Sequence, residues 1–457
     1  MGLDNLTAIW NRVRDSLWFL PAVLTLASVV LALVTIQLDV SDVLPEAPGG
    51  VWLFSGTAAG ARGVLTAIAS GFITVTGVVF SVTIVAIQLA STQFTPRILR
   101  NFTADRVNQL VLGVFIATFT YALLVLRVVE GDTGGVTPED LAAGGGAAGA
   151  SAPGFVPNLS VTVAVVLAVV SIGFLIYFID HAARSVQASV IIDRVTAAAV
   201  DTLDRRLPAR VGEPGDDDVE TVIPAAQGHP VVARASGYLQ GVDQDALLSL
   251  LGRDAVTIRM EPRIGEFVLA GGTLATVWPA GLAGDDLERS IHDAFILGHE
   301  RTPHLDVELG VIELVDIAVK ALSPGINDPT TATLCVDRIC EVLLDFARRE
   351  PPGRVRRLPR EGGVLVLPRL EFDRLVDTAL DGIRRYGVED PRFTRSVLDR
   401  LVDLGRLLPA DRKPPVARHA AALLRTAREA TRDPWDLRRV EAAGERALAA
   451  LDVGRPT

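Results

Sequence analysis

Four long apolar stretches occur in the first 180 residues and are separated by more polar segments. They cover residues 17–38, 64–90, 108–129 and 159–179. Each has at least the roughly 20 residues that a helix needs to cross the hydrocarbon core of a bilayer. The first is too long for a signal peptide, and no small-residue cleavage site follows it. The pattern therefore predicts a domain of four transmembrane helices at residues 1–180.

The second stretch, residues 64–90, differs from the others in its polar content. It contains no charged residue, yet hydroxyl, glycine and amide positions recur along it at intervals of three, four or seven. Residues at these intervals share one face of a helix, so they form a polar stripe that continues just beyond the stretch. The members of the polar stripe are Thr66, Ser70, Thr74, Gly77, Ser81, Gln88 and Thr92.

Two interpretations of the polar stripe are open. Small and hydroxyl-bearing residues let helices approach closely and hydrogen-bond across the contact, so the stripe can be a packing surface. Polar groups that face lipid are costly, so the same residues can instead line a water-filled path. In that case Arg97 and Arg100, close to one end of the helix, are candidates for the mouth of a pore and would favour anions.

The charged residues between the stretches predict the orientation in the membrane. Arginines lie before the first span, between the second and third, and after the fourth. The segments 39–63 and 130–157 are mainly acidic instead. Because positively charged loops stay inside, we expect a multi-pass protein of the bacterial inner (plasma) membrane with both termini in the cytoplasm. Segment 130–157 is rich in Gly and Ala and is expected to be a flexible outer loop.

The remainder of the chain has the patterns of a soluble region. Residues 181–211 keep a helical period and are predicted to continue the fourth span as one long helix into the cytoplasm. Short β-branched and aromatic runs between turn residues predict a small β module at 219–280. Helical patterns return at 285–350, which includes the turn sequence SPGINDP, and at 370–457. Segment 351–369 is expected to be a linker with one short strand.

The predicted fold class is an α-helical integral membrane protein with four transmembrane helices and a cytoplasmic α+β region. In that region a small β-barrel-like module precedes a helical domain. The strand–glycine–strand pattern at 258–279 is similar to the half-barrel of biotinyl and lipoyl carrier domains, which attach their cofactor to a lysine. The first lysine of the chain is Lys320, so covalent carriage by this module is excluded and no cofactor is expected.

Three of the six histidines cluster in residues 291–310 together with several carboxylates. Imidazole and carboxylate groups suit zinc, iron or manganese, so His292, His299 and His304 are candidate metal ligands. A zincin-type site needs two histidines four apart in one helix, whereas Pro303 interrupts this segment. We therefore predict no metal site and expect a polar loop that caps two helices, with Asp306 near a helix N-terminus.

The sequence SPGINDP, residues 323–329, is typical of a tight connection between two helices. Asp328 is suited to cap the second helix, with Pro329 in its first turn. An enzymatic interpretation would require Asn327, Asp328, Lys320 and His304 to converge on a substrate. Nothing in their spacing requires this, and no catalytic residue or enzyme activity is predicted.

The composition narrows the function classes further. A formal net charge of −10, without long basic blocks, argues against a nucleic-acid partner. The basic residues are almost all arginines, a bias typical of GC-rich bacterial genomes. Two cysteines, Cys335 and Cys340, are expected to be ordinary buried thiols rather than a disulfide.

Two motifs taken together resemble a known family. They are VTGVVFSVTIVAIQLASTQFTPRIL at 75–99 and ERTPHLDVELGVIELVDIAVKALSPGINDPTTA at 300–332. The chain is similar, over about residues 10–430, to the bacterial predicted membrane proteins grouped as domain of unknown function 2254. The resemblance implies an integral inner-membrane protein with a cytoplasmic C-terminal half, and it supplies no catalytic residues.

Three functions are open from the sequence. The first is an oligomeric ion channel or conductance pathway lined by the polar stripe; four helices make a thin monomer, so a homo-oligomer in the lipid bilayer is expected. The alternative is a membrane-anchored sensor or scaffold whose cytoplasmic domain binds a ligand or partner. The third is a metal-dependent enzyme at the membrane face, which would use the histidine cluster.

Overall fold

The structure is a computed structural model that describes most of the chain in two compact units. The membrane unit comprises the described residues up to Gln187 apart from Gln93, and the C-terminal unit comprises Gln93 and the described residues from Ala188 onward. The described residues are 18–41, 54–93, 105–129, 155–185, 187–206, 213–214, 219–251, 256–302, 305–349, 353–358 and 361–452.

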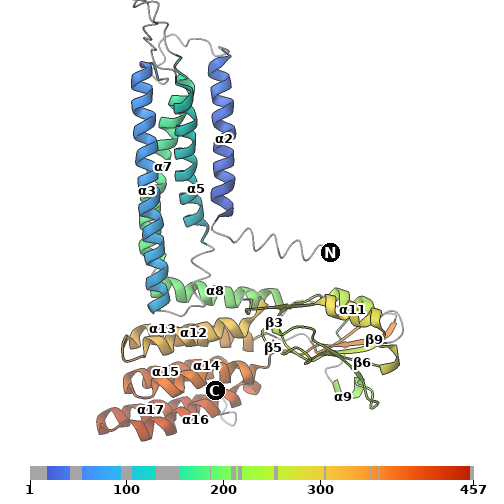
Figure 1. Ribbon diagram of the computed structural model, residues 1–457. Helices are drawn as coiled ribbons and strands as arrows, with labels where there is room; N and C mark the ends of the chain where they lie inside the picture. The colour runs from blue at the N-terminus through green and yellow to red at the C-terminus, as the bar shows by residue number, and fades with distance from the viewer. Residues whose placement is uncertain are drawn as a thin grey trace, which may run out of the picture. The chain divides into compact units, whose positions relative to one another are not determined.

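Four helices form the described part of the membrane unit, and each is long and apolar enough to cross a membrane (Figure 1). They are α2 (Phe19–Val40), α3 (Ala58–Gln93), α5 (Arg106–Val128) and α7 (Asn158–Ser185). The four predicted spans are confirmed, and α3 extends beyond its apolar stretch at both ends. At about 1.5 Å per residue, α3 reaches roughly 54 Å, well beyond a bilayer core of about 30 Å.

Helix α5 packs against both α2 and α7 and supplies the largest buried side chains of the membrane unit, Phe115 and Tyr121. Gly113 allows α2 to approach closely. A Cβ atom at this position would lie 2.7 Å from Leu24 Cδ1 and 3.0 Å from Pro21 Cα. The contact between α2 and α5 therefore depends on the absence of a side chain at Gly113.

The C-terminal unit contains two sheets that share one hydrophobic core, with Leu239, Ile258 and Leu365 completely buried. The larger sheet has the order β1-β8-β9-β4-β6-β2 and is antiparallel except between β4 and β9; the smaller has the order β5-β3-β7. The strands are β1 (Glu213–Pro214), β2 (His229–Val232), β3 (Gly237–Val242), β4 (Thr257–Met260), β5 (Phe267–Val268), β6 (Thr273–Trp278), β7 (Phe295–Gly298), β8 (Val355–Leu358) and β9 (Glu361–Val366). The accompanying short helices are α9 (Val219–Val222), α10 (Gln244–Leu251), the 3-10 helix η2 (Ala280–Leu282) and α11 (Asp285–Ala294).

The helices of the C-terminal unit stack in layers, as Figure 1 shows: α8 lies on α12 and α13, followed by α14 with α15 and then α16 with α17. Their bounds are α8 (Ala188–Arg206), α12 (Val307–Ala321), α13 (Pro329–Ala347), α14 (Phe372–Gly387), α15 (Pro391–Leu407), the 3-10 helix η4 (Ala410–Arg412), α16 (Lys413–Ala430) and α17 (Pro434–Leu451). Aspartate side chains accept backbone N–H groups at the start of four of them. These caps are Asp306, Asp328, Asp390 and Asp433.

The prediction of one long helix over 181–211 is wrong. Helix α7 ends at Ser185, and α8 starts anew at Ala188. Helix α8 is amphipathic and buries residues such as Ile192 and Leu203 while it packs on α12 and α13. This apolar face therefore fixes α8 within the C-terminal unit.

Two stretches were assigned too few strands from the sequence. Residues 295–298, predicted as the end of a helix, form β7, because they pair with β3 across a long sequence separation. Segment 351–369, predicted to hold one short strand, contains both β8 and β9, which pair with each other and join the larger sheet through β4. In both cases the partner strand decides the structure, since short apolar runs carry little preference of their own.

Candidate functional site on helix α3

Helix α3 presents an apolar face to the rest of the membrane unit. The buried positions recur at intervals of three, four or seven and therefore lie on one side of the helix. The ring of Phe72 lies 5.7 Å from that of Phe115 in α5, centroid to centroid. The buried side chains of α3 are Ala61, Leu65, Ala69, Phe72 and Val79.

The polar stripe lies on the opposite side of α3 and is open. A Cβ atom built at Gly71 or Gly77 would meet no other atom within 4 Å. Within the described part of the membrane unit, no other helix covers this face, so packing against the helices of the same subunit does not account for it. The exposed members of the polar stripe are Thr66, Ser70, Thr74, Gly77, Ser81 and Gln88.

Three predicted site residues lie beyond what the structure describes. Arg97 and Arg100, the candidates for a pore mouth, fall in the segment 94–100. Thr92 belongs to α3, but its side chain is outside the described set. The structure therefore brings together the first six members of the polar stripe on one open face and does not test the other three residues.

Two hydroxyl groups of the polar stripe, those of Ser70 and Thr74, bond within their own helix. Ser70 Oγ donates to the carbonyl oxygen of Thr66 at 2.8 Å, and Thr74 Oγ1 donates to that of Ser70 at 2.8 Å. This arrangement satisfies each donor locally, and the oxygen lone pairs remain available at the open surface. The stripe can therefore accept hydrogen bonds from water or from another chain without first breaking a contact between helices.

The other membrane helices place their polar groups inside. Thr35 Oγ1 of α2 and Tyr121 Oη of α5 lie 2.8 Å apart, as do Thr118 Oγ1 of α5 and Ser171 Oγ of α7. Asp39 caps the first turn of α7 by accepting two backbone N–H groups at 3.0 and 2.9 Å. In the middle of α2 and α7 the exposed side chains are apolar, examples being Leu26, Leu33, Val166, Val169 and Ile176.

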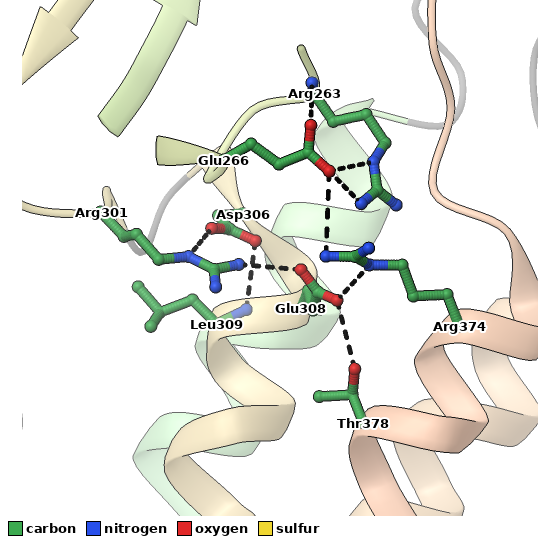
Figure 2. A network of polar contacts seen from close by, with 8 residues as sticks. All are labelled: Arg263, Glu266, Arg301, Asp306, Glu308, Leu309, Arg374 and Thr378. Carbon is green, nitrogen blue, oxygen red and sulfur yellow. Dashed lines mark hydrogen bonds and ion pairs between the residues drawn. The ribbon is translucent and has the colours of Figure 1, made fainter. Parts of the chain in front are cut away.

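The expected polar loop before α12 is present, in a cluster that joins it to neighbouring elements (Figure 2). The carboxylate of Asp306 accepts the backbone N–H of Leu309 at 3.1 Å and Arg301 Nε at 2.6 Å. Arg301 also donates to Glu308 at 3.1 Å. The position of Asp306 at a helix N-terminus is therefore confirmed.

The same cluster continues from α12 to α14 and to the β module. Glu308, which is buried, accepts Arg374 Nε at 2.7 Å and the hydroxyl of Thr378 at 3.2 Å (Figure 2). Arg374 also lies 3.8 Å from Glu266, which pairs with Arg263. We call the six charged residues of this cluster the charged network: Arg263, Glu266, Arg301, Asp306, Glu308 and Arg374.

The electrostatics of the charged network are balanced. Burial alone would raise the pKa of Glu308, but hydrogen bonds and charge from Arg374 and Arg301 outweigh it and hold the pKa below its ordinary value. The pKa of Glu266 is lowered in the same way, mainly by a hydrogen bond from Arg263 against the opposing effect of burial. Three acids therefore lie opposite three arginines, and the charged network links the β module to helices α12 and α14.

Gly265 is required beside the charged network. Its φ of +86° lies in the region that favours glycine, and a Cβ atom there would sit 2.1 Å from Asp306 Oδ2. The glycine therefore allows the loop between β4 and β5 to approach the cap of α12. Neither this contact nor the arginine partners of Glu308 were found from the sequence, since residues 308 and 374 are 66 positions apart.

The candidate metal ligands are distributed as follows. His292 is half-buried in α11, and its pKa is lowered by burial and then by the nearby charge of Arg234. His299 follows β7 and is exposed, and His304 is outside the described residues. Among the residues that the structure describes, no group of three His, Cys, Asp or Glu side chains could hold a metal ion.

The SPGINDP turn connects α12 and α13. Asp328 caps α13, accepting the backbone N–H of Thr331 at 3.0 Å and its hydroxyl at 2.6 Å, and these bonds lower the pKa of Asp328. Asn327 has a φ of +49°, which asparagine tolerates better than most residues. The convergence required for an enzymatic site includes His304, which the structure does not describe.

Comparisons with known proteins match residues 14–403 to the family described as predicted membrane protein, domain of unknown function 2254. An uncharacterised protein of Mycobacterium bovis is 33% identical over 461 aligned residues, which cover 98% of this chain and 83% of that protein. An uncharacterised protein of Mycobacterium tuberculosis strain H37Rv has the same identity and coverage. No solved structure matches the chain.

Proposed function

The chain belongs to the predicted membrane proteins of domain of unknown function 2254, and from this premise we propose that it forms an oligomeric conductance pathway for small ions. The observation that carries the proposal is the open polar stripe on α3, from Thr66 to Gln88. Polar groups on a membrane helix are normally turned toward protein or water, because exposure to acyl chains is unfavourable. In a ring of identical subunits, the polar stripe would contact both protein and water.

The other exposed faces of the membrane unit support this arrangement. The exposed middle parts of α2 and α7 are apolar and suit contact with lipid, whereas α3 exposes the polar stripe beside apolar side chains such as Val78 and Phe80. In the proposed assembly α3 therefore faces the symmetry axis, and α2 and α7 face the bilayer. Residues 64–90 contain no charge, which suits a passive pathway better than a proton-coupled one.

The membrane orientation belongs to the same proposal. The arginines outside the spans support an orientation with both termini in the cytoplasm of a bacterial cell and α3 crossing the inner membrane. Arg97 and Arg100 then follow the cytoplasmic end of the polar stripe, where positive charge at a pore mouth favours anions.

The proposal is tested by ion efflux from liposomes that contain the full-length protein, measured with potassium- and chloride-selective electrodes. We expect flux from the wild type, reduced at least roughly tenfold by Ser81→Leu or Thr74→Leu, which corresponds to about 1.4 kcal/mol of added barrier. Val82→Leu is the matched control, because Val82 is exposed on α3 but lies next to Ser81 and on a different face. A folded oligomer without flux would contradict the proposal.

Thiol accessibility separates a water-lined path from dry packing between subunits. In a Cys335→Ala/Cys340→Ala background, Ser81→Cys and Ser70→Cys should react with a membrane-impermeant thiol reagent, and Val82→Cys should not. The native thiols contribute little in any case, since burial raises the pKa of both to about 12. Equal protection of all three engineered cysteines would favour packing and contradict the water-lined path.

A further inference from the structure

The polar stripe is interrupted at one place. Successive members are three or four residues apart except between Ser81 and Gln88, which are seven apart. The vacant turn on that face is occupied by Ile84, three residues after Ser81 and four before Gln88. Val85 lies at its edge, four residues after Ser81. An aliphatic turn therefore separates two polar parts of the same helix face.

Both aliphatic side chains project from the open side of α3. Ile84 is 45% exposed and Val85 is 50% exposed, so the described helices of the membrane unit do not cover them. The nearest hydroxyl in this turn, that of Thr83, is half-buried and donates to the carbonyl oxygen of Val79 at 2.8 Å. Because Thr83 follows Ser81 by two residues, it lies on another side of the helix and does not restore a polar lining at the gap.

We infer that Ile84 and Val85 form a hydrophobic gate in the proposed pathway, an inference that rests on the proposed function. A ring of aliphatic side chains in a narrow pore expels water, and an ion must then shed hydration to pass. Ser81 on one side and Gln88 on the other keep the adjoining segments wet. A small widening of the ring admits water, so the gate opens without movement of any charged group.

The gate is tested by introducing a hydroxyl at Ile84 in the full-length, reconstituted protein. Ile84→Thr keeps a β-branched side chain, so the helix is little affected. Val82→Thr is the matched control, because Val82 is 43% exposed but lies on another face of α3. Flux of potassium and chloride from liposomes is compared after light scattering has shown that each variant keeps the wild-type oligomeric size.

We expect Ile84→Thr to raise the flux by roughly tenfold, equivalent to a barrier lowered by about 1.4 kcal/mol, and Val82→Thr to leave it unchanged. Equal flux in Ile84→Thr and wild type, with Ser81→Leu still blocking, would overturn the gate and leave the pathway standing. An equal rise in Val82→Thr would also overturn the gate. Absence of flux from every variant would overturn the pathway itself.

Discussion

The interior of the α2, α5 and α7 bundle and the outer face of α3 contain similar side chains in opposite situations. In the bundle, hydroxyl groups meet across helices, as in the pairs Thr35–Tyr121 and Thr118–Ser171. On α3, the hydroxyls of Ser70 and Thr74 bond back to their own helix and face outward. Composition alone therefore does not reveal whether a polar membrane residue serves packing, because its function depends on which surface it occupies.

In the charged network of the C-terminal unit, as in the bundle interior, polar side chains meet partners inside the protein, and here the side chains are charged. Its acids and arginines pair with one another, and Glu308 is buried among them. The polar stripe is uncharged and uncovered. Substitutions in the charged network or in the bundle interior are therefore expected to lower stability, whereas substitutions in the polar stripe should alter assembly or flux and leave the fold intact.

The largest effect is expected for Glu308→Gln, which removes the charge that faces Arg301 and Arg374. Breaking a buried ion pair costs about 3–5 kcal/mol, and the partial exposure of Arg374 places this case at about 3 kcal/mol. Denaturant unfolding of the detergent-solubilised chain, followed by tryptophan fluorescence, measures the loss. Glu389→Gln, at an exposed position, should change stability little; equal losses in both variants would contradict a special role for the network.

Glycine substitutions compare the two faces of the membrane unit directly. Gly113→Ala places a methyl group against Leu24 and the Pro21 backbone and should destabilise the bundle by about 1–3 kcal/mol. Gly77→Ala meets open space in the subunit and should leave its fold unchanged or slightly more stable. Circular dichroism during unfolding in mixed detergent micelles measures both. A similar loss at Gly77 would mean that the outer face of α3 is packed within the subunit.

The pH dependence should distinguish the charged network from the polar stripe. The pKa values of Glu308 and Glu266 are lowered in the folded protein, so their stabilisation is complete above the unfolded carboxyl pKa of about 4.3. It is lost as the pH falls through the lower, folded values, with a slope of up to about 1.4 kcal/mol per pH unit for each carboxylate.

Unfolding measured between about pH 3 and pH 6 tests this expectation. Glu308→Gln should remove its share of the acid-dependent slope, whereas Ser81→Leu should keep the wild-type slope, since the polar stripe has no titratable group. An unchanged slope in Glu308→Gln would show that this carboxylate does not titrate as the network requires.

The smallest effect separates hydroxyls that bond across helices from those that bond within one helix. A double-mutant cycle of Thr118→Val and Ser171→Ala should give a coupling of about 0.6 kcal/mol, typical of hydrogen bonds between membrane helices. A matched cycle of Ser70→Ala and Thr74→Ala on the polar stripe tests for such a contact on α3. It should give a coupling near zero in the solubilised monomer, because neither hydroxyl bonds to another helix. Comparable coupling energies in the two cycles would contradict the difference between hydroxyls that bond across helices and hydroxyls that bond within one helix.

Local patterns predicted many of the elements and little of the contacts between them. The four spans follow from apolar length, and Asp306 and Asp328 cap the helices expected for them, because both properties depend on neighbouring residues. The strand β7 and the separate start of helix α8 at Ala188 were missed. Each depends on partners far along the chain, which a local period does not contain.

For the candidate site, the sequence by itself determined that Thr66, Ser70, Thr74, Gly77, Ser81 and Gln88 share one face of a membrane helix, since helical period alone requires it. It did not determine which way that face points. The tertiary structure decided this, because the apolar residues on the other side of α3, from Ala61 to Val79, pack into the subunit and turn the stripe outward. A period relates residues within a helix, whereas orientation depends on the surfaces that the helix meets.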